Sequence, residues 1–152
     1  MTRPADSGSD PGPTMLYLVK QLELAVRAQL DEVLRPASIT TLQYTALTVL
    51  ERRSDLSTAA LARNAFVTDQ SAADMVGSLE SRGLIERVPD PSDRRRKVLR
   101  LTDAGKALLH ELRDDVAGVQ ERMLAPLARG EAEDLRRYVI ACRGALSSRP
   151  PH

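Results

Sequence analysis

The sequence predicts a mainly α-helical protein that carries one small two-stranded β-hairpin. Apolar residues recur at three- and four-residue spacing over six stretches, the period of an amphipathic helix. This period is interrupted between about 84 and 101, where two short apolar segments flank a loop, as in a hairpin. Hydrophobic residues make up 42% and charged residues 28% of the 152 residues, a balance typical of one soluble domain with a core.

The first predicted helix spans about 14–34 and ends at Pro36, since proline cannot continue a helix. Its apolar stripe includes Leu18, Leu22, Val26 and Leu30. Thr40 and Gln43 then form a capping-box pattern, with Thr40 at the N-cap and Gln43 three residues later. A second helix is therefore expected to begin after Thr40 and to run to about Arg53.

Two shorter helices follow, each after a residue whose hydroxyl can cap it. Ser57 precedes a predicted helix over 58–64, and Thr68 precedes another over about 69–82. The inward face of the latter is expected to hold Ala72, Met75, Val76 and Leu79. Gly83 stands where a left-handed glycine commonly ends a helix.

The predicted hairpin has strands at 84–88 and 98–101, joined by a loop with four consecutive cations. Thr102 is expected to cap a fifth helix that ends near Leu124 or Pro126. A sixth helix is predicted over 131–146, with Leu135, Tyr138, Val139, Cys142 and Leu146 on one face.

The two ends of the chain are predicted to be a disordered tail over 1–13 and a frayed tail over 148–152. The N-terminal residues lack the apolar stretch of a signal peptide, and no apolar run approaches the roughly 20 residues of a membrane span. A single cysteine agrees with a reducing compartment. We therefore expect a cytoplasmic protein without a membrane partner.

Two short capped helices followed by a hairpin form a winged helix-turn-helix, which places its second helix in the major groove of DNA. The net charge of +1 favours no partner by itself, but residues 82–106 hold eight Lys/Arg against four Asp/Glu. The cations of the wing, Arg94, Arg95, Arg96 and Lys97, are predicted to meet phosphates or the minor groove. The alternative is a solvated run of charge.

The hairpin and its flanks resemble the wing signature of the multiple-antibiotic-resistance regulator (MarR) family. The matching residues are Leu79-Glu80, Gly83-Leu84-Ile85, Arg87, Asp93-Arg94-Arg95, Leu101-Thr102 and Gly105, with Ile39-Thr40, Gln43 and Leu61-Ala62 upstream. The resemblance covers about 14–147. It implies a homodimeric regulator of transcription that binds palindromic duplex DNA and is usually relieved by a small ligand or an oxidant. We expect a repressor released by a small aromatic or lipophilic ligand.

The expected organisation is a DNA-binding region over 39–101 between two dimerisation segments, 14–38 and 102–147. The first, fifth and sixth helices each present a broad apolar face, which two copies can bury across a two-fold axis. Two recognition helices would then face half-sites roughly 34 Å apart.

The polar face of the fourth helix holds the expected DNA contacts Thr68, Gln70, Ser71, Asp74 and Ser78. Glutamine can pair with adenine and aspartate can accept from cytosine, while hydroxyls can hold phosphate. The alternative is a simple exposed polar face. At Asp74 the chain departs from the family, which often has a basic residue there. Asp69 is expected to stabilise the N-terminus of the helix through the helix dipole instead of contacting DNA.

Within the wing, the resemblance puts Arg94 at the tip and implies that Asp93 and Arg95 pair to hold its shape. It also places an effector pocket between the DNA-binding unit and the dimer helices. Tyr17, Tyr44 and Phe66 are candidates for that pocket, although a core position is the favoured interpretation of Phe66.

No residue pattern predicts catalysis, a cofactor or a metal site. His110 and His152 have no partners with zinc-site spacing, and Cys142 has only Arg143 beside it to favour a thiolate. Two other functions stay open: a winged-helix module that binds a protein, suggested by Asp69 and Asp74, and a constitutive DNA-binding protein without an effector.

Overall fold

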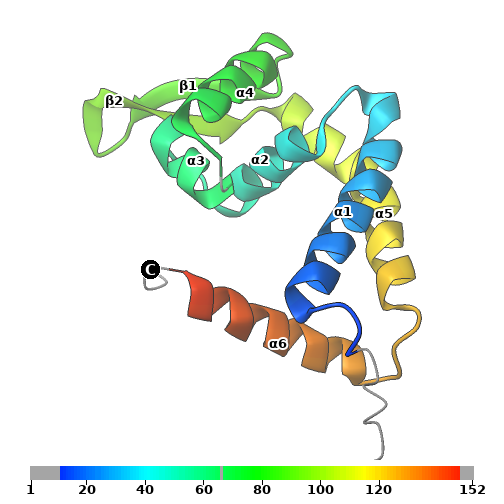
Figure 1. Ribbon diagram of the computed structural model, residues 1–152. Helices are drawn as coiled ribbons and strands as arrows, with labels where there is room; N and C mark the ends of the chain where they lie inside the picture. The colour runs from blue at the N-terminus through cyan, green and yellow to red at the C-terminus, as the bar shows by residue number, and fades with distance from the viewer. Residues whose placement is uncertain (1–10, 66, 148–152) are drawn as a thin grey trace, which may run out of the picture.

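The computed structural model describes residues 11–65 and 67–147. Its elements are α1 (Met15–Leu34), a short 3-10 helix (Arg35–Ala37), α2 (Thr41–Arg52), α3 (Thr58–Ala65), α4 (Asp69–Ser81), β1 (Ile85–Asp90), β2 (Asp93–Leu101), α5 (Asp103–Leu124) and α6 (Glu131–Leu146). Helices α2–α4 and the hairpin form one lobe, from which α1 and α5 extend toward α6 (Figure 1). The predicted fold class is confirmed. Of the two predicted tails, 1–10 and 148–152 lie outside the described residues.

The capping residues predicted from the sequence begin four of these helices. The hydroxyl of Thr40 accepts from the N–H of Gln43 at 3.1 Å, and the Gln43 side chain accepts from the N–H of Thr40 at 3.0 Å, which completes the capping box. Ser57, Thr68 and Thr102 each accept a backbone N–H in the same way at the starts of α3, α4 and α5. Each bond satisfies a donor that the helix itself leaves unpaired.

The hydrophobic core lies in the lobe, where the helices meet the base of the hairpin. Its largest fully buried side chains are Leu34, Leu47, Leu61, Leu79, Ile85, Leu99 and Val76. The four residues predicted for the inward face of α4 are all buried. At Gly105 a Cβ would lie 2.2 Å from the carbonyl oxygen of Leu84, so only glycine allows α5 to pack this closely on the chain before β1.

The hairpin is longer than predicted. Its strands pair in antiparallel register from Ile85↔Leu101 to Pro89↔Lys97 and again at Asp90↔Asp93. The predicted start of the second strand, at 98, was wrong, because β2 begins at Asp93 and includes all four wing cations. Three of them, Arg94–Arg96, lie between the last two pairs, where the register shifts and the strand bulges. Backbone pairing needs no apolar side chains, so the apolar pattern of the sequence does not indicate this charged part of the strand.

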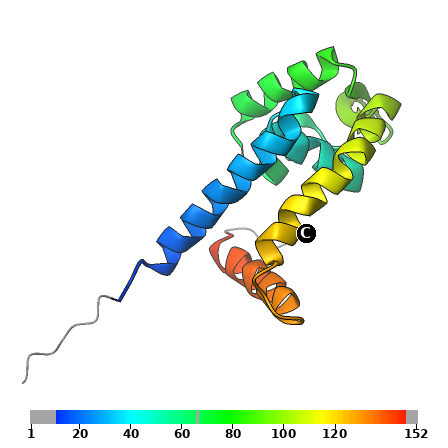
Figure 2. The ribbon, with the colours of Figure 1, turned by 90° about the vertical axis from the view of Figure 1, so that its right-hand side faces the viewer.

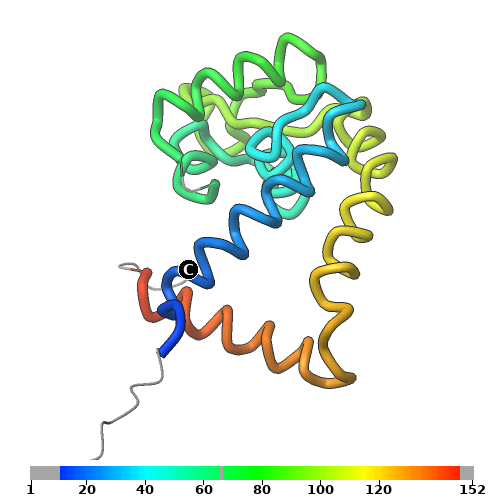
Figure 3. Tube along the Cα trace, turned by 45° about the vertical axis from the view of Figure 1, so that its right-hand side comes forward, coloured from blue at the N-terminus to red at the C-terminus, as the bar shows by residue number. Residues whose placement is uncertain are grey.

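Helices α1, α5 and α6 form an open arrangement. Helices α1 and α5 contact each other and diverge away from the lobe, and α6 runs across their far ends (Figures 2 and 3). No residue of α6, all of which the structure describes, is buried. Large apolar side chains are exposed along the first half of α1: Met15, Leu16, Tyr17, Leu18, Val19, Leu22 and Leu24. Within the described ranges, no helix is both long enough and apolar enough to cross a membrane.

Candidate nucleic-acid interface

The outer face of α4 is mostly polar. Its five predicted contact residues, Thr68, Gln70, Ser71, Asp74 and Ser78, are all exposed. The buried side of the same helix fixes which residues face outward, because apolar residues at three- and four-residue spacing occupy the core.

Hydrogen bonds join neighbouring side chains on this face of α4. The hydroxyls of Thr68 and Ser71 are 3.0 Å apart, and the Thr68 oxygen also accepts the N–H of Ser71 at 3.1 Å. One turn further on, Nε2 of Gln70 donates to Oδ1 of Asp74 at 3.1 Å. The Gln70 and Asp74 side chains therefore form a pair, which spacing alone permitted but did not predict.

Ser78 links α4 to α2. Its hydroxyl oxygen accepts from Nε2 of Gln43 at 3.2 Å, and the other end of the same amide completes the capping box with Thr40. One glutamine thus begins α2 and also holds the second half of α4. The capping role had a signal in the sequence, but the contact with Ser78 had none.

Arg82, just after α4, fastens this end of the helix to the connection between α1 and α2. Its guanidinium donates to the carbonyl oxygen of Ser38 at 2.7 Å and to that of Ala37 at 2.8 Å. The adjacent Glu80 forms an ion pair with Arg87 of β1 at 3.4 Å. These contacts set the position of α4 relative to α1 and to the hairpin, and no local pattern in the sequence indicates them.

Two aspartates shape the tip of the wing. Oδ1 of Asp90 accepts the N–H of Ser92 at 2.9 Å and its hydroxyl at 2.8 Å. These bonds, the N–H first, lower the pKa of Asp90, with smaller help from the charge of Arg96. Asp93 accepts the N–H of Arg95 at 3.1 Å. The expected contact between Asp93 and Arg95 is therefore made through the backbone, and it does not use the guanidinium.

The four cations of the wing are all exposed. None of them forms an ion pair with any residue that the structure describes. Their charge is therefore available to a partner, and the nearest fixed acids, Asp90 and Asp93, are held by hydrogen bonds at the tip.

The base of the wing is braced by the connection between α2 and α3. Nε of Arg100 lies 2.6 Å from Oδ1 of Asp55, and this hydrogen bond, more than the charge of Asp55 itself, raises the pKa of Arg100. Next to it, the N–H of Leu99 donates to the carbonyl oxygen of Leu56 at 2.8 Å. The hairpin is thus fixed at its base and free to contact a partner at its tip.

A groove of about 1460 Å³ runs between α1, the start of α2, the end of α5 and α6. Its apolar lining includes Leu18, Leu22, Leu30, Leu42, Val139 and Ile140. A volume of this size is typical of a large ligand site or of a surface that a second chain covers.

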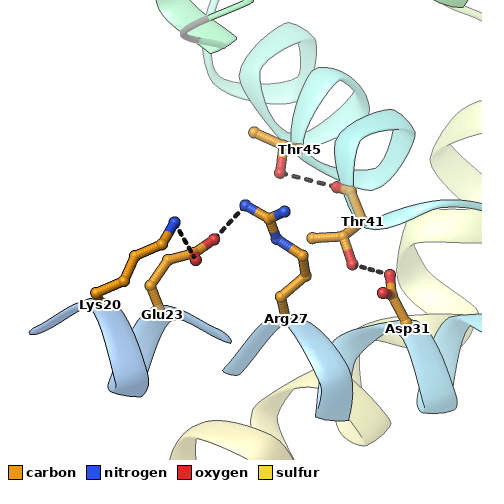
Figure 4. Close-up of polar contacts among 6 residues, drawn as sticks. All are labelled: Lys20, Glu23, Arg27, Asp31, Thr41 and Thr45. Carbon is orange, nitrogen blue, oxygen red and sulfur yellow. Dashed lines mark hydrogen bonds and ion pairs between the residues drawn. The ribbon is translucent and has the colours of Figure 1, made fainter. Parts of the chain in front are cut away.

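Polar side chains of α1 and α2 follow one wall of this groove (Figure 4). Glu23 pairs with Arg27 and, at 3.7 Å, with Lys20. The hydroxyl of Thr41 donates to Oδ1 of Asp31 at 2.5 Å, which joins the start of α2 to α1. An apolar groove with a charged wall suits a ligand that has an apolar body and a polar group.

The two described residues that were predicted for an effector pocket, Tyr17 and Tyr44, lie outside the groove. Tyr17 is 55% exposed on α1, and Tyr44 packs against the core. Burial raises the pKa of Tyr44, the charge of Glu51 adds to the rise, and Arg113 opposes it. Neither tyrosine lines the groove. Phe66 lies outside the described residues.

Cys142 is a free, exposed thiol on α6. Among the described residues no three His, Cys, Asp or Glu side chains are grouped closely enough to hold a metal ion.

Residues 37–96 match the sequence model of the MarR family. The HTH-type transcriptional repressor Rv2887 of Mycobacterium tuberculosis is 29% identical over 123 residues, which cover 81% of this chain and 88% of the repressor. The transcriptional regulator HosA of Escherichia coli is 31% identical over 93 residues, which cover 61% of this chain and 68% of HosA.

Solved structures give the same result. The transcriptional repressor CouR, bound to a 23-mer DNA duplex, has a TM-score of 0.78 and 27% identity, and the match covers 86% of this chain and 92% of CouR. Rv2887 in complex with p-aminosalicylic acid has a TM-score of 0.71 and 27% identity, over 86% of this chain and 98% of that one. The chain therefore belongs to the MarR family of winged helix-turn-helix transcriptional regulators.

Proposed function

We propose that the protein is a homodimeric repressor that binds a palindromic operator in duplex DNA and is released by a small ligand. The observation that carries this proposal is that an exposed, mostly polar helix, α4, and four exposed cations of β2 lie in the same lobe, away from α6 (Figures 1 and 3). Among the described residues these cations have no ion-pair partner. A helix of this kind fits the major groove, and cations beside it fit the phosphates.

Each exposed residue of the lobe has a proposed role. Thr68 and Ser71 hold phosphate at the N-terminus of α4, where the helix dipole also favours an anion. Gln70 and Asp74 lie toward the base edges, and Ser78 marks the far end of the same face. Arg94, Arg95, Arg96 and Lys97 contact the backbone or the minor groove beside the site, while Asp93 keeps the tip in shape.

The dimer follows from apolar surface that one chain leaves open. Leu146 is 85% exposed and Leu16 is 80% exposed, and α6 buries no residue at all. Soluble monomers rarely expose apolar patches of this extent. A second copy that packs its α1, α5 and α6 on the same helices buries them, so segments 14–38 and 102–147 are the proposed dimerisation region.

The ligand is proposed to enter the groove between the lobe and the dimer helices. Support comes from the apolar lining with its charged wall, and from the relative Rv2887, which was crystallised with salicylic acid and with p-aminosalicylic acid. A small aromatic or lipophilic ligand at this place changes the separation of the two recognition helices. Tyr17, Tyr44 and Phe66 remain proposed contributors once the second copy is in place.

The proposed role is one of binding alone, without catalysis or a cofactor. A repressor of this kind acts on the chromosome, so the cytoplasm of a bacterium is its proposed location.

Selection of binding sites from a random duplex library tests the DNA-binding part. We expect one enriched palindrome whose half-sites are about one helical turn apart. Selection without any enriched sequence would overturn it and favour the alternative, a winged-helix module that binds a protein.

Titration with salicylic acid tests the ligand part. We expect the acid to raise the Kd for the selected operator. An unchanged Kd across the titration, together with no binding of the acid by calorimetry, would exclude salicylic acid as the ligand and favour the alternative, a constitutive DNA-binding protein.

A further inference from the structure

The pair formed by Gln70 and Asp74 points to the base preference of α4. Both side chains are exposed on the outer face, and Nε2 of Gln70 donates to Oδ1 of Asp74 at 3.1 Å. We infer that Asp74 is a positioning residue, which orients the Gln70 amide so that it selects adenine at one position of each half-site. This inference rests on the proposed function, in which α4 enters the major groove.

The chemistry of the two groups fixes the direction of the bond. An ionised carboxylate only accepts hydrogen bonds, so the amide of Gln70 must turn its nitrogen toward Asp74. One N–H is then used, which leaves the carbonyl oxygen and the second N–H of the amide to form an edge that can meet a base. Adenine presents the complement of this edge in the major groove, an N7 acceptor next to an N6 donor.

The same contact gives a reason for an acid on a face that meets DNA. A free carboxylate on that face repels the phosphates and lowers affinity for every sequence. Asp69, another acid on α4, lies in the first turn, where it complements the helix dipole, and Glu80 pairs with Arg87. Asp74 lies beyond the first turn, and its described hydrogen-bond partner is Gln70.

Anchors at the other end of α4 make the position of the amide reproducible. Ser78 is bound to Gln43, and Arg82 is bound to Ser38 and Ala37. Base readout depends on such second contacts, because an amide displaced by about 1 Å no longer makes both bonds. The helix that presents Gln70 is therefore held by the lobe as well as by DNA.

The test measures a ratio of affinities rather than an affinity. Selection with the wild-type dimer gives the operator, and selection with Gln70→Ala identifies the position at which the adenine preference is lost. Kd is then measured on the operator and on operators with each other base pair there. We expect the wild type to prefer adenine by about tenfold or more.

Two variants of Asp74 separate positioning from charge. Asp74→Ala is expected to lose most of the adenine preference while it binds non-specific DNA more tightly, because a negative charge is gone. Asp74→Asn also removes the charge, but its side-chain oxygen still accepts from Gln70, so the preference is expected to return. Asp69→Asn is the matched control: it removes an acid from the same helix and is expected to leave the ratio unchanged.

Three results would overturn the inference. If Asp74→Ala keeps the ratio of Kd values between adenine and the other bases, the carboxylate does not orient Gln70. Loss of a cytosine preference at another position would show that Asp74 contacts a base itself. Loss of the ratio in Asp74→Asn as well would show that charge, and not orientation, matters. Matching thermal unfolding of the variants excludes misfolding, and failure of the wild type to select any palindrome would instead remove the proposed function, and the inference with it.

Discussion

The guanidinium of Arg82 donates to the carbonyl oxygen of Ser38 at 2.7 Å, across a separation of 44 residues in the chain. Ser38 has a left-handed backbone, with φ of 54°, at the point where the chain turns from α1 into α2. The residue that follows α4 is therefore bound to the connection that leaves α1. The contact thus joins the end of α4 to the end of α1.

Replacement of this arginine tests the contact. Arg82→Ala is expected to lower the free energy of unfolding by about 1 kcal/mol, since two charge-assisted hydrogen bonds are lost but the side chain is exposed. Urea unfolding of the purified dimer measures the change. Arg63→Ala, an exposed arginine on α3, serves as the control and should alter stability by much less. Equal effects of the two replacements would contradict the anchoring role.

The wing cations predict a change in salt dependence. Each phosphate contact contributes about 0.9 to the slope of log affinity against log salt, so Arg94→Gln should lower the magnitude of that slope by about 1.8 in a dimer with two wings. Fluorescence anisotropy at four salt concentrations gives the slope. Arg129→Gln, in the exposed turn before α6, should leave it unchanged. A slope unaltered by Arg94→Gln would mean that this side chain contacts no phosphate.

The exposed apolar helices predict that one charge can separate the dimer. Val139 is 56% exposed in the single chain, on a helix, α6, that has no buried residue, so the proposed interface covers it. Val139→Asp would bury an unpaired carboxylate, and we expect sedimentation to show a monomer at micromolar concentration. Glu111→Gln on the exposed face of α5 should remain dimeric. If the Val139→Asp variant is still a dimer with wild-type affinity, the interface lies elsewhere.

The hydrogen bonds at the tip of the wing predict that stability depends on the protonation of Asp90 at acidic pH. The pKa of Asp90 is lowered in the folded protein, so its ionised carboxylate stabilises the fold. This stabilisation is fully present above the ordinary aspartate pKa and is lost as the pH falls through the lowered pKa. Carboxyl carbon shifts followed by NMR should give a titration below the ordinary value of about 3.9. Ser92→Ala removes the hydroxyl bond and should move the titration upward, toward that value. A titration at the ordinary value in the wild type would contradict the tip geometry.

Local features of the sequence predicted much of the fold. The hydroxyls of Thr40 and Thr68 cap helices where expected, because a cap depends only on residues three positions apart. The bounds of α6 match the prediction, since the apolar period defines them. Local chemistry was sufficient in these cases.

Contacts between distant segments could not be predicted in this way. Nothing local to Arg82 indicates that it binds Ser38, and nothing local to Gln43 indicates Ser78. The charged run after Asp93 suggested a loop because its side chains show no strand period, although its backbone belongs to β2. Such features depend on how elements pack, and they decide where α4 and the wing lie relative to each other.

The most direct test of the proposed dimer changes the spacing of the operator. In the proposed dimer, two copies of α4 enter successive major grooves on one face of the DNA. Insertion of five base pairs between the selected half-sites turns them to opposite faces of the duplex, while the sequence of each half-site is unchanged. We expect the Kd to rise about a thousandfold, to the level of non-specific binding. An unchanged Kd would mean that each copy binds alone, and would contradict the dimeric recognition proposed here.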